Sequence, residues 1–232
     1  CSIREKAYQK AVSEIGRMRD LKSVVAVTGC VASHDGASLL KRFPFVDIVL
    51  GPDHEASLPR LVKEIAGKKA GKKEGVFYND FKDLSDYEFP SQILWNDAGP
   101  RVNAFVTIMK GCDNACSFCI VPFVRGGEVS RPSGEILDEI RRLEGQGVRE
   151  VLLLGQNVNS YGKGFDPRIT FAALLRRIDE ETSIPRIRFT SPHPKDLSPE
   201  LVCEYGKNEK LCPQIHLPVQ AGSDLVLKRM RR

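Results

Sequence analysis

The chain has 232 residues, of which 41% are hydrophobic and 28% are charged, and its formal net charge is +5. This composition is that of an ordinary globular protein with room for one large domain or two modest ones. It contains no run of about eighteen apolar residues and no secretory-signal pattern, which argues against a membrane-spanning or secreted protein and predicts a cytoplasmic one. The mild positive charge permits a nucleic-acid partner without demonstrating one.

The first part of the chain predicts a small parallel α/β domain. Ser2-Ile3-Arg4-Glu5 has the spacing of a capping box, so a helix is expected directly after Cys1. The elements expected after it are strands at 23–28 and 45–50 and helices near 37–42 and 55–68. Because each strand is a continuous apolar run and the strands alternate with helices, we expect a parallel sheet covered by helices.

The pattern becomes polar from 71 to 100, where only 75–78 is strand-like, and we interpret this stretch as the connection between domains. A second series of strands and helices follows it. Its expected elements are strands at 104–109, 148–154, 186–190 and 214–217, helices at 133–144, 170–179 and 199–205, and a helical pattern after Ser223. Four successive βα units predict a barrel or open parallel sheet with its site beyond the carboxyl ends of the strands. We therefore assign 1–80 to an N-terminal domain, 81–100 to a linker and 101–232 to a partial barrel.

Seven cysteines are present, and three of them, Cys112, Cys116 and Cys119, share one loop with C-x3-C-x2-C spacing. An intracellular chain uses clustered thiols for metals or redox chemistry, not for disulfides. Three cysteines on a tight loop can hold three irons of a 4Fe-4S cluster and leave the fourth iron open to a ligand, whereas a structural zinc needs a fourth protein ligand. The alternative of a zinc loop completed by a distant residue draws on four candidates: Cys203, Cys212, His193 and His216. Plain buried thiols are the simpler interpretation of Cys203 and Cys212.

The cysteine spacing, the aromatic Phe118 before the third cysteine and the preceding strand resemble the radical S-adenosylmethionine superfamily. Further segments are similar to its methylthiotransferase family: 121–123, 125–132, 154–161, 188–194 and 216–223. Gly155-Gln156-Asn157-Val158-Asn159 resembles most the subgroup that acts on N6-isopentenyladenosine beside the anticodon of tRNA. The resemblance implies two 4Fe-4S clusters, S-adenosylmethionine, a tRNA substrate and an electron donor of the flavodoxin or ferredoxin type.

The family also implies roles for single residues. Cys112, Cys116 and Cys119 are expected to hold the cluster that binds S-adenosylmethionine. Cys1 and Cys30 match two of the three cysteines that hold a second, sulfur-donating cluster. The residues expected to contact S-adenosylmethionine are Phe118, Gln156, Asn157, Ser191, His193 and Gln220, most of which follow strand ends. Arg125 and Arg131 are expected to face either phosphate or a carboxylate.

The sequence departs from the family pattern at both ends. The first cysteine of the N-terminal triad is absent, and so are the last units of the barrel and the small C-terminal β-barrel, known as a TRAM-like domain, that helps the family hold tRNA. We therefore expect a fragment of a longer protein. Two alternatives remain open: a ribosomal-protein aspartate methylthiotransferase or other radical enzyme, and a non-enzymatic iron-sulfur or zinc module.

Overall fold

The computed structural model of the chain describes residues 4–67, 75–82, 87, 89, 102–165 and 167–232. The expected ligand Cys1, the expected cap Ser2 and most of the expected linker 81–100 lie outside these residues. The chain forms two compact units, the first made of Cys1–Glu88 with Phe118–Gly126 and the second of Phe89–Ser117 with Gly127–Arg232. Residues 118–126, expected in the second domain, thus belong to the first unit.

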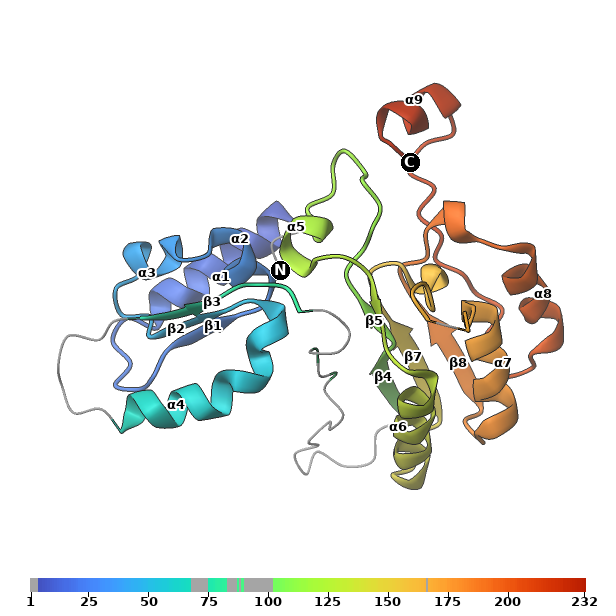
Figure 1. Ribbon diagram of the computed structural model, residues 1–232, viewed down its shortest axis with the longest axis horizontal. Helices are drawn as coiled ribbons and strands as arrows, with labels where there is room; N and C mark the ends of the chain where they lie inside the picture. The colour runs from blue at the N-terminus through green and yellow to red at the C-terminus, as the bar shows by residue number, and fades with distance from the viewer. Residues whose placement is uncertain (1–3, 68–74, 83–86, 88, 90–101, 166) are drawn as a thin grey trace. The chain divides into compact units, whose positions relative to one another are not determined.

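The first unit is built on a parallel sheet in the order β1-β2-β3, drawn in blue to green in Figure 1. Its strands are β1 (Ala26–Thr28), β2 (Ile48–Leu50) and β3 (Val76–Tyr78). Ile48 pairs with Ala26 on one side and with Val76 on the other. The apolar runs predicted the first two strands, and the strand-like residues 75–78 form the third strand of this sheet and not part of a connection.

Helices cover both faces of this sheet. They are α1 (Glu5–Arg17), α2 (Cys30–Asp35) and α3 (Ser38–Arg42) on one face and α4 (Leu58–Ala66) on the other. The unit also contains the 3-10 helix η1 (Pro52–Ser57) and α5 (Val121–Arg125), which packs against α2. Val49 packs in a cluster with residues of α1, α2 and α3, whereas its neighbours Ile48 and Leu50 pack with Leu61 and Ile65 of α4. Because side chains alternate along a strand, β2 contributes to two cores and is buried on both sides.

The second unit is built on a parallel sheet in the order β4-β7-β8. Its strands are β4 (Asn103–Thr107), β7 (Glu150–Leu154) and β8 (Arg186–Phe189), and a short antiparallel ribbon joins β5 (Met109–Lys110) to β6 (Val129–Ser130). The helices are α6 (Ser133–Gly145), α7 (Phe171–Glu181), α8 (Pro199–Lys207) and α9 (Asp224–Arg229), with short 3-10 helices η2 (Val158–Ser160) and η3 (Pro194–Asp196).

The core of the second unit lies between one face of this sheet and the helices α6, α7 and α8, which Figure 1 shows beside it. Val151 and Leu153 of β7 are fully buried in this core. The opposite face is less covered, since Phe105 on β4 is 60% exposed. This arrangement places the loops that follow the strands at one edge of the sheet, which is where the candidate site lies.

Three sequence predictions need correction. The first helix, expected directly after Cys1, begins at Glu5, because Arg4 has an extended backbone (φ −117°, ψ 124°) and is the cap. Helix α2, which lies between the first expected strand and the helix expected near 37–42, was not predicted. Residues 214–217 form no strand: pairing with β8 stops at the isolated bridge between Ile187 and Leu211. Prolines, which lack the N–H donor of a sheet, flank this segment at 213 and 218.

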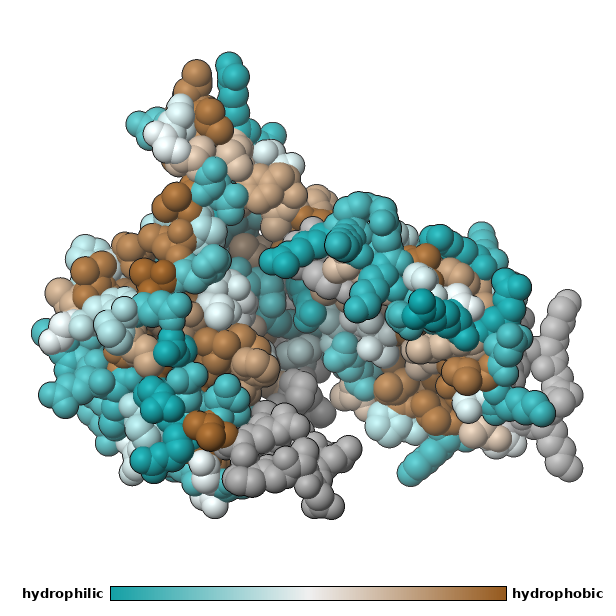
Figure 2. Space-filling model, turned by 180° about the vertical axis from the view of Figure 1, so that it is seen from behind, coloured by the Kyte–Doolittle hydropathy of each residue, from teal (hydrophilic) through white to brown (hydrophobic). Residues whose placement is uncertain are grey.

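The end of the second unit carries exposed apolar side chains. They are visible around α9, at the top of Figure 2, where Leu225 is 61% exposed and Val226 42% exposed. None of the residues of α9 is buried, so this helix adds nothing to the core described above. Among the described residues, no helix is both long and apolar enough to cross a lipid bilayer.

Candidate active site

The three-cysteine loop begins where the ribbon strand β5 ends. Gly111 has φ 73°, a left-handed conformation that glycine adopts without strain, and it turns the chain into the loop. Its backbone N–H donates a hydrogen bond to Oε1 of Gln156, which follows β7, at 2.6 Å. Gln156, expected to contact the cofactor, therefore also fixes the start of the cysteine loop.

Inside the loop, Cys112 and Cys116 are buried. Asn114 is also buried, and its Nδ2 donates to Sγ of Cys112 at 3.5 Å. Its Oδ1 accepts a hydrogen bond from Nζ of Lys195 at 2.9 Å. Asn114 thus joins the loop to the segment after β8, because its side chain bonds both the buried Cys112 thiol and the Lys195 ammonium.

His193 points at the second thiol of the loop. Asn159 holds its backbone with two hydrogen bonds, each of 2.8 Å. The backbone N–H of Lys195 donates to Nδ1 at 3.1 Å, and Nε2 lies 3.9 Å from Sγ of Cys116. Because Nδ1 is an acceptor, the proton of the neutral imidazole belongs on Nε2, where it faces the sulfur. Desolvation, with a contribution from the Arg232 cation, lowers the pKa of His193 and so favours this neutral form.

Asn157 is almost fully buried, with 1% of its surface exposed. Its Nδ2 donates to Oδ2 of Asp196 at 2.7 Å and to Oε1 of Glu128 at 3.3 Å. Its Oδ1 is buried and accepts no hydrogen bond from the part of the chain that the structure describes. A buried acceptor without a donor is unfavourable, so this atom suits a ligand that brings an N–H or O–H group.

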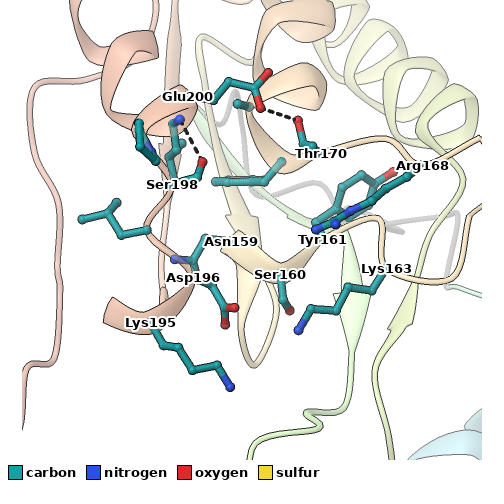
Figure 3. A pocket seen from close by; sticks show the side chains of 15 residues that line it. Asn159, Ser160, Tyr161, Lys163, Arg168, Thr170, Lys195, Asp196, Ser198 and Glu200 are labelled. Carbon is teal, nitrogen blue, oxygen red and sulfur yellow. Dashed lines mark hydrogen bonds between the residues drawn. The ribbon is translucent and has the colours of Figure 1, made fainter.

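A pocket of about 430 Å³ shares three residues with this network, Asn159, Lys195 and Asp196. Figure 3 shows the ammonium ends of Lys195 and Lys163 on the same side of the pocket as the carboxylate of Asp196. At its other end, Thr170 and Ser198 cap the helices α7 and α8. The pocket thus offers cations, carboxylates and hydroxyls together, which suits a polar ligand with groups of both charges.

The structure does not bring every predicted residue into this network. Ser191 and Gln220 both have left-handed backbones, with φ 62° and 66°, and exposed side chains that take no part in the hydrogen bonds above. Phe118, 55% exposed, and the partly exposed Cys119 belong to the first compact unit. Within the described residues, no three His, Cys, Asp or Glu side chains are arranged as they stand to hold a metal ion.

The donor set nevertheless fits the cluster expected from the sequence. Three thiols come from one short loop, and thiolates are the ligands that iron-sulfur clusters take. Two of these thiols are buried beside neutral or cationic N–H donors, from Asn114, His193 and Arg232. Such donors offset the negative charge of thiolates. Of the four distant candidates for a zinc ligand, Cys203 is exposed on α8, whereas Nε2 of His193 lies 3.9 Å from Sγ of Cys116.

Cys203 and Cys212 were expected to be buried thiols, and this prediction is wrong, since Cys203 is exposed and Cys212 is half-buried.

Arg131 pairs with carboxylates and not with phosphate: it is 1% exposed and contacts Glu139 and Glu135. Arg125 has a different partner, since its Nε donates to Sγ of Cys30 at 3.0 Å within the first unit. Cys30 is buried there at the first position of α2.

Sequence reasoning missed the residues that hold the site together. They are Asn114, Glu128, Asn159, Lys195 and Asp196. Glu128 and Asn159 stand inside segments that resemble the methylthiotransferases, and Asn114 lies in the cysteine loop itself, so their positions were a signal. Lys195 and Asp196 follow the last such residue after β8, and nothing in the sequence links them to the cysteine loop.

Comparison with known families places these features in context. The Radical SAM superfamily matches residues 106–232, and the Uncharacterized protein family UPF0004 matches residues 1–51. A protein of Anaeromyxobacter dehalogenans named tRNA-2-methylthio-N(6)-dimethylallyladenosine synthase is 49% identical over 100% of this chain and 48% of its own length. A protein of the same name from Geobacter metallireducens is 48% identical over 100% of this chain and 52% of its own length. The chain spans about half the length of these relatives.

Solved structures show the same fold at low sequence identity. The radical S-adenosylmethionine methyltransferase TsrM from Kitasatospora setae, with tryptophan and an S-adenosylmethionine analogue bound, has a TM-score of 0.63 at 16% identity. It aligns over 95% of this chain and 46% of its own. The cobalamin-dependent radical enzyme OxsB has a TM-score of 0.55, also at 16% identity, over 98% of this chain and 35% of its own. The α/β fold class, with a small parallel unit before a partial radical S-adenosylmethionine barrel, is confirmed.

The resemblance to the methylthiotransferases is confirmed by the named relatives, which match the whole chain. S-adenosylmethionine and a 4Fe-4S cluster, the cofactors predicted from the cysteine loop, are those that the matched superfamily uses. The superfamily matches more than half of the sequence, including all three cysteines of the loop. This chain therefore belongs to the radical S-adenosylmethionine superfamily.

Proposed function

We propose that the chain is part of a tRNA methylthiotransferase, which adds a methylthio group to C2 of N6-isopentenyladenosine beside the anticodon. The observation that carries this proposal is the 49% identity over the whole chain to a relative named for that product. The proposal concerns the longer protein to which this chain belongs, because the chain spans about half of such relatives. For that enzyme we propose a cytoplasmic location, because it would act on tRNA.

In this proposal, Cys112, Cys116 and Cys119 would hold the 4Fe-4S cluster. When bound, the cluster and S-adenosylmethionine would supply the radical chemistry that activates a carbon–hydrogen bond. The protein's own residues orient and shield this chemistry. Gln156 anchors the loop, Asn114 and His193 direct N–H groups at two thiols, and Asn157 offers a buried acceptor to the cofactor.

The first unit supplies the sulfur in this proposal. Cys30, with Cys1 and a third cysteine outside this chain, holds the second 4Fe-4S cluster, and a second S-adenosylmethionine provides the methyl group. Phe118, Ser191 and Gln220 are kept as further contacts of S-adenosylmethionine, and an electron donor of the flavodoxin or ferredoxin type reduces the enzyme. The division 1–80, 81–100 and 101–232 is kept as the order of domains along the chain, with 118–126 packing within the first unit.

Cleavage of S-adenosylmethionine by the reconstituted full-length protein tests the cluster assignment. Cys112→Ala, Cys116→Ala or Cys119→Ala should abolish cleavage of S-adenosylmethionine to 5′-deoxyadenosine, because each removes one corner of the cluster. Cys203→Ala is the control and should cleave at the wild-type rate, since this thiol is exposed on α8. Loss of cleavage in the control variant would show that the ligands are misassigned.

The substrate is tested in cells that lack the gene. Mass spectrometry of their tRNA nucleosides should show the isopentenyl nucleoside without its methylthio group. Complementation with Cys30→Ala should leave that nucleoside unmodified although cofactor cleavage continues in the purified protein. If the methylthio nucleoside persists without the gene, the tRNA assignment is wrong and the ribosomal-protein alternative comes first.

A further inference from the structure

We propose that Arg125 is a positioning residue for the second iron-sulfur site: it holds Cys30 and supplies a fixed positive charge that favours the reduced state of the cluster there. This inference rests on the proposed function, in which Cys30 is a ligand of that cluster. It assigns a role to a residue outside the cysteine motifs.

The first support is the direct contact. Nε of Arg125 donates to Sγ of Cys30 at 3.0 Å. Cys30 is 7% exposed, so its thiol is largely withdrawn from water. Helix α5, which ends at Arg125, packs against α2, which begins at Cys30. The contact therefore joins two helix ends of one compact unit and is not a chance meeting of two surface side chains.

The second support is how the end of α5 is fixed. Gly126 has φ 73°, a conformation that suits glycine, and it closes the helix directly after Arg125. A Cβ at this position would lie 2.9 Å from Cγ of Phe81, so a larger residue would clash. The backbone that carries Arg125 is thus held by a close approach that only glycine allows.

The third support is the charge around the guanidinium. Desolvation raises the pKa of Glu55, while the Arg125 cation lowers it, so the two groups interact. Glu55 also lies beside the start of α2, since its Oε1 is 3.6 Å from the position a Cβ would take on Gly29. Glu55 thus lies within electrostatic range of the Arg125 guanidinium, near the start of α2.

The consequence for a cluster follows from charge. An arginine remains protonated at any pH the protein meets, and N–H donors and net charge near the sulfurs set the reduction potential of an iron-sulfur cluster. Reduction adds one negative charge to the cluster, and a fixed cation stabilises that state. Removing the cation should therefore shift the midpoint potential to more negative values.

The experiment uses the full-length protein with Cys112→Ala, Cys116→Ala and Cys119→Ala, so that only the second cluster can form. Its midpoint potential is measured by electron paramagnetic resonance during an anaerobic redox titration, with iron and sulfide content determined in parallel. In this background, Arg125→Gln should lower the ratio of reduced to oxidised cluster about tenfold at a given potential, a shift of about 59 mV for one electron. Arg125→Lys, which keeps the charge but not the Nε donor, should restore part of this loss.

Arg60→Gln is the matched control, because Arg60 lies in the same unit but pairs with Glu64 on the exposed side of α4. Its potential should equal that of the parent. Equal potentials for Arg125→Gln and the parent, at full iron content, would overturn the inference. If Arg125→Gln alone fails to retain iron while Arg125→Lys and Arg60→Gln retain it, the result supports a need for a positive charge at position 125 of this site. A parent protein that holds no cluster at all would instead refute the second cluster of the proposed function.

Discussion

The two sheets of the molecule differ in how their faces are covered. In the first unit, Ile48 and Val49 of β2 point to opposite faces and both are fully buried. In the second unit, Leu153 of β7 is fully buried, whereas Leu152 beside it is only partly buried and Phe105 on β4 is 60% exposed. A sheet with one open face leaves side chains and strand ends available to ligands, and the polar network of the candidate site lies at such strand ends.

The two units also differ in how they place charge. The second unit buries an ion pair, since the side chains of Arg131 and Glu139 are 1% and 6% exposed. The pair Arg60–Glu64 in the first unit has side chains that are 63% and 49% exposed. A buried pair is costly to break because one charge is left unpartnered, whereas an exposed pair contributes little. The stability of the second unit should therefore depend on specific polar contacts.

Arg131→Gln should give the largest loss of stability. It leaves Glu139 buried without its cation and removes the bond from Arg131 to the Thr107 carbonyl, so the second unit should lose about 3–5 kcal/mol. Hydrogen exchange followed by mass spectrometry reads peptides of each unit separately. Arg60→Gln is the control and should change the first unit by about 0–1 kcal/mol. Similar losses of stability for Arg131→Gln and Arg60→Gln would show that the buried ion pair contributes no more than the exposed one.

Neighbouring leucines on β7 test the one-sided core. Leu153→Ala should destabilise the second unit by about 2–5 kcal/mol, because it leaves a cavity in a packed core, and Leu152→Ala should cost clearly less. In the first unit, Ile48→Ala and Val49→Ala should both cost on the order of 2 kcal/mol, since both faces are packed. Local exchange rates measure all four variants. Equal losses at Leu152 and Leu153 would show that the second sheet is covered on both faces.

The sequence predicted most of the fold because buried parallel strands are continuous apolar runs. The runs that became β2 and β7 are fully visible in the sequence, and Thr170 marks the start of α7 as a cap residue. Residues 214–217 also alternate apolar and polar residues, yet they form no strand, because a strand requires a partner and prolines bound this segment. The periodicity of a segment shows that it is compatible with a strand, and a neighbouring strand must be available for pairing before the strand forms.

The candidate site was predicted in its thiols but not in its supports. C-x3-C-x2-C is a local pattern, so Cys112 and Cys116 could be found by spacing alone. The bond between Asn114 and Lys195 joins residues 81 positions apart, and no local pattern encodes such a pairing. Arg125 was singled out for its charge, but a thiol as its partner follows only from the packing of α5 on α2.

Thr170→Ala should have a smaller effect than the core variants. Thr170 accepts a hydrogen bond from the N–H of Ala173 at 3.1 Å and donates one to Glu200 at 3.2 Å, so it caps α7 and ties it to α8. Its loss should destabilise the second unit by about 1 kcal/mol, seen as faster exchange at the start of α7. Arg4→Ser is the converse test: α1 has no side-chain cap, so this variant should slow exchange in its first turn.

Glu150 should give the smallest effect, and one that depends on pH. Burial tends to raise its pKa, but hydrogen bonds and charge from Arg186 and Arg188 on β8 outweigh this and lower the pKa below 4.5. The folded carboxylate therefore stabilises the protein above about pH 4.5, and this contribution disappears as the pH falls through the lowered pKa. The strands β1 and β2 of the first unit carry no charged side chain, so no such dependence is expected from them.

Glu150→Gln should shift the urea midpoint at pH 6 by the equivalent of about 0.2–1 kcal/mol and at pH 3 by much less. Glu180→Gln, on the exposed side of α7, is the control, and a Glu150→Gln loss of equal size at both pH values would show that packing, and not charge, joins β7 to β8 at this position.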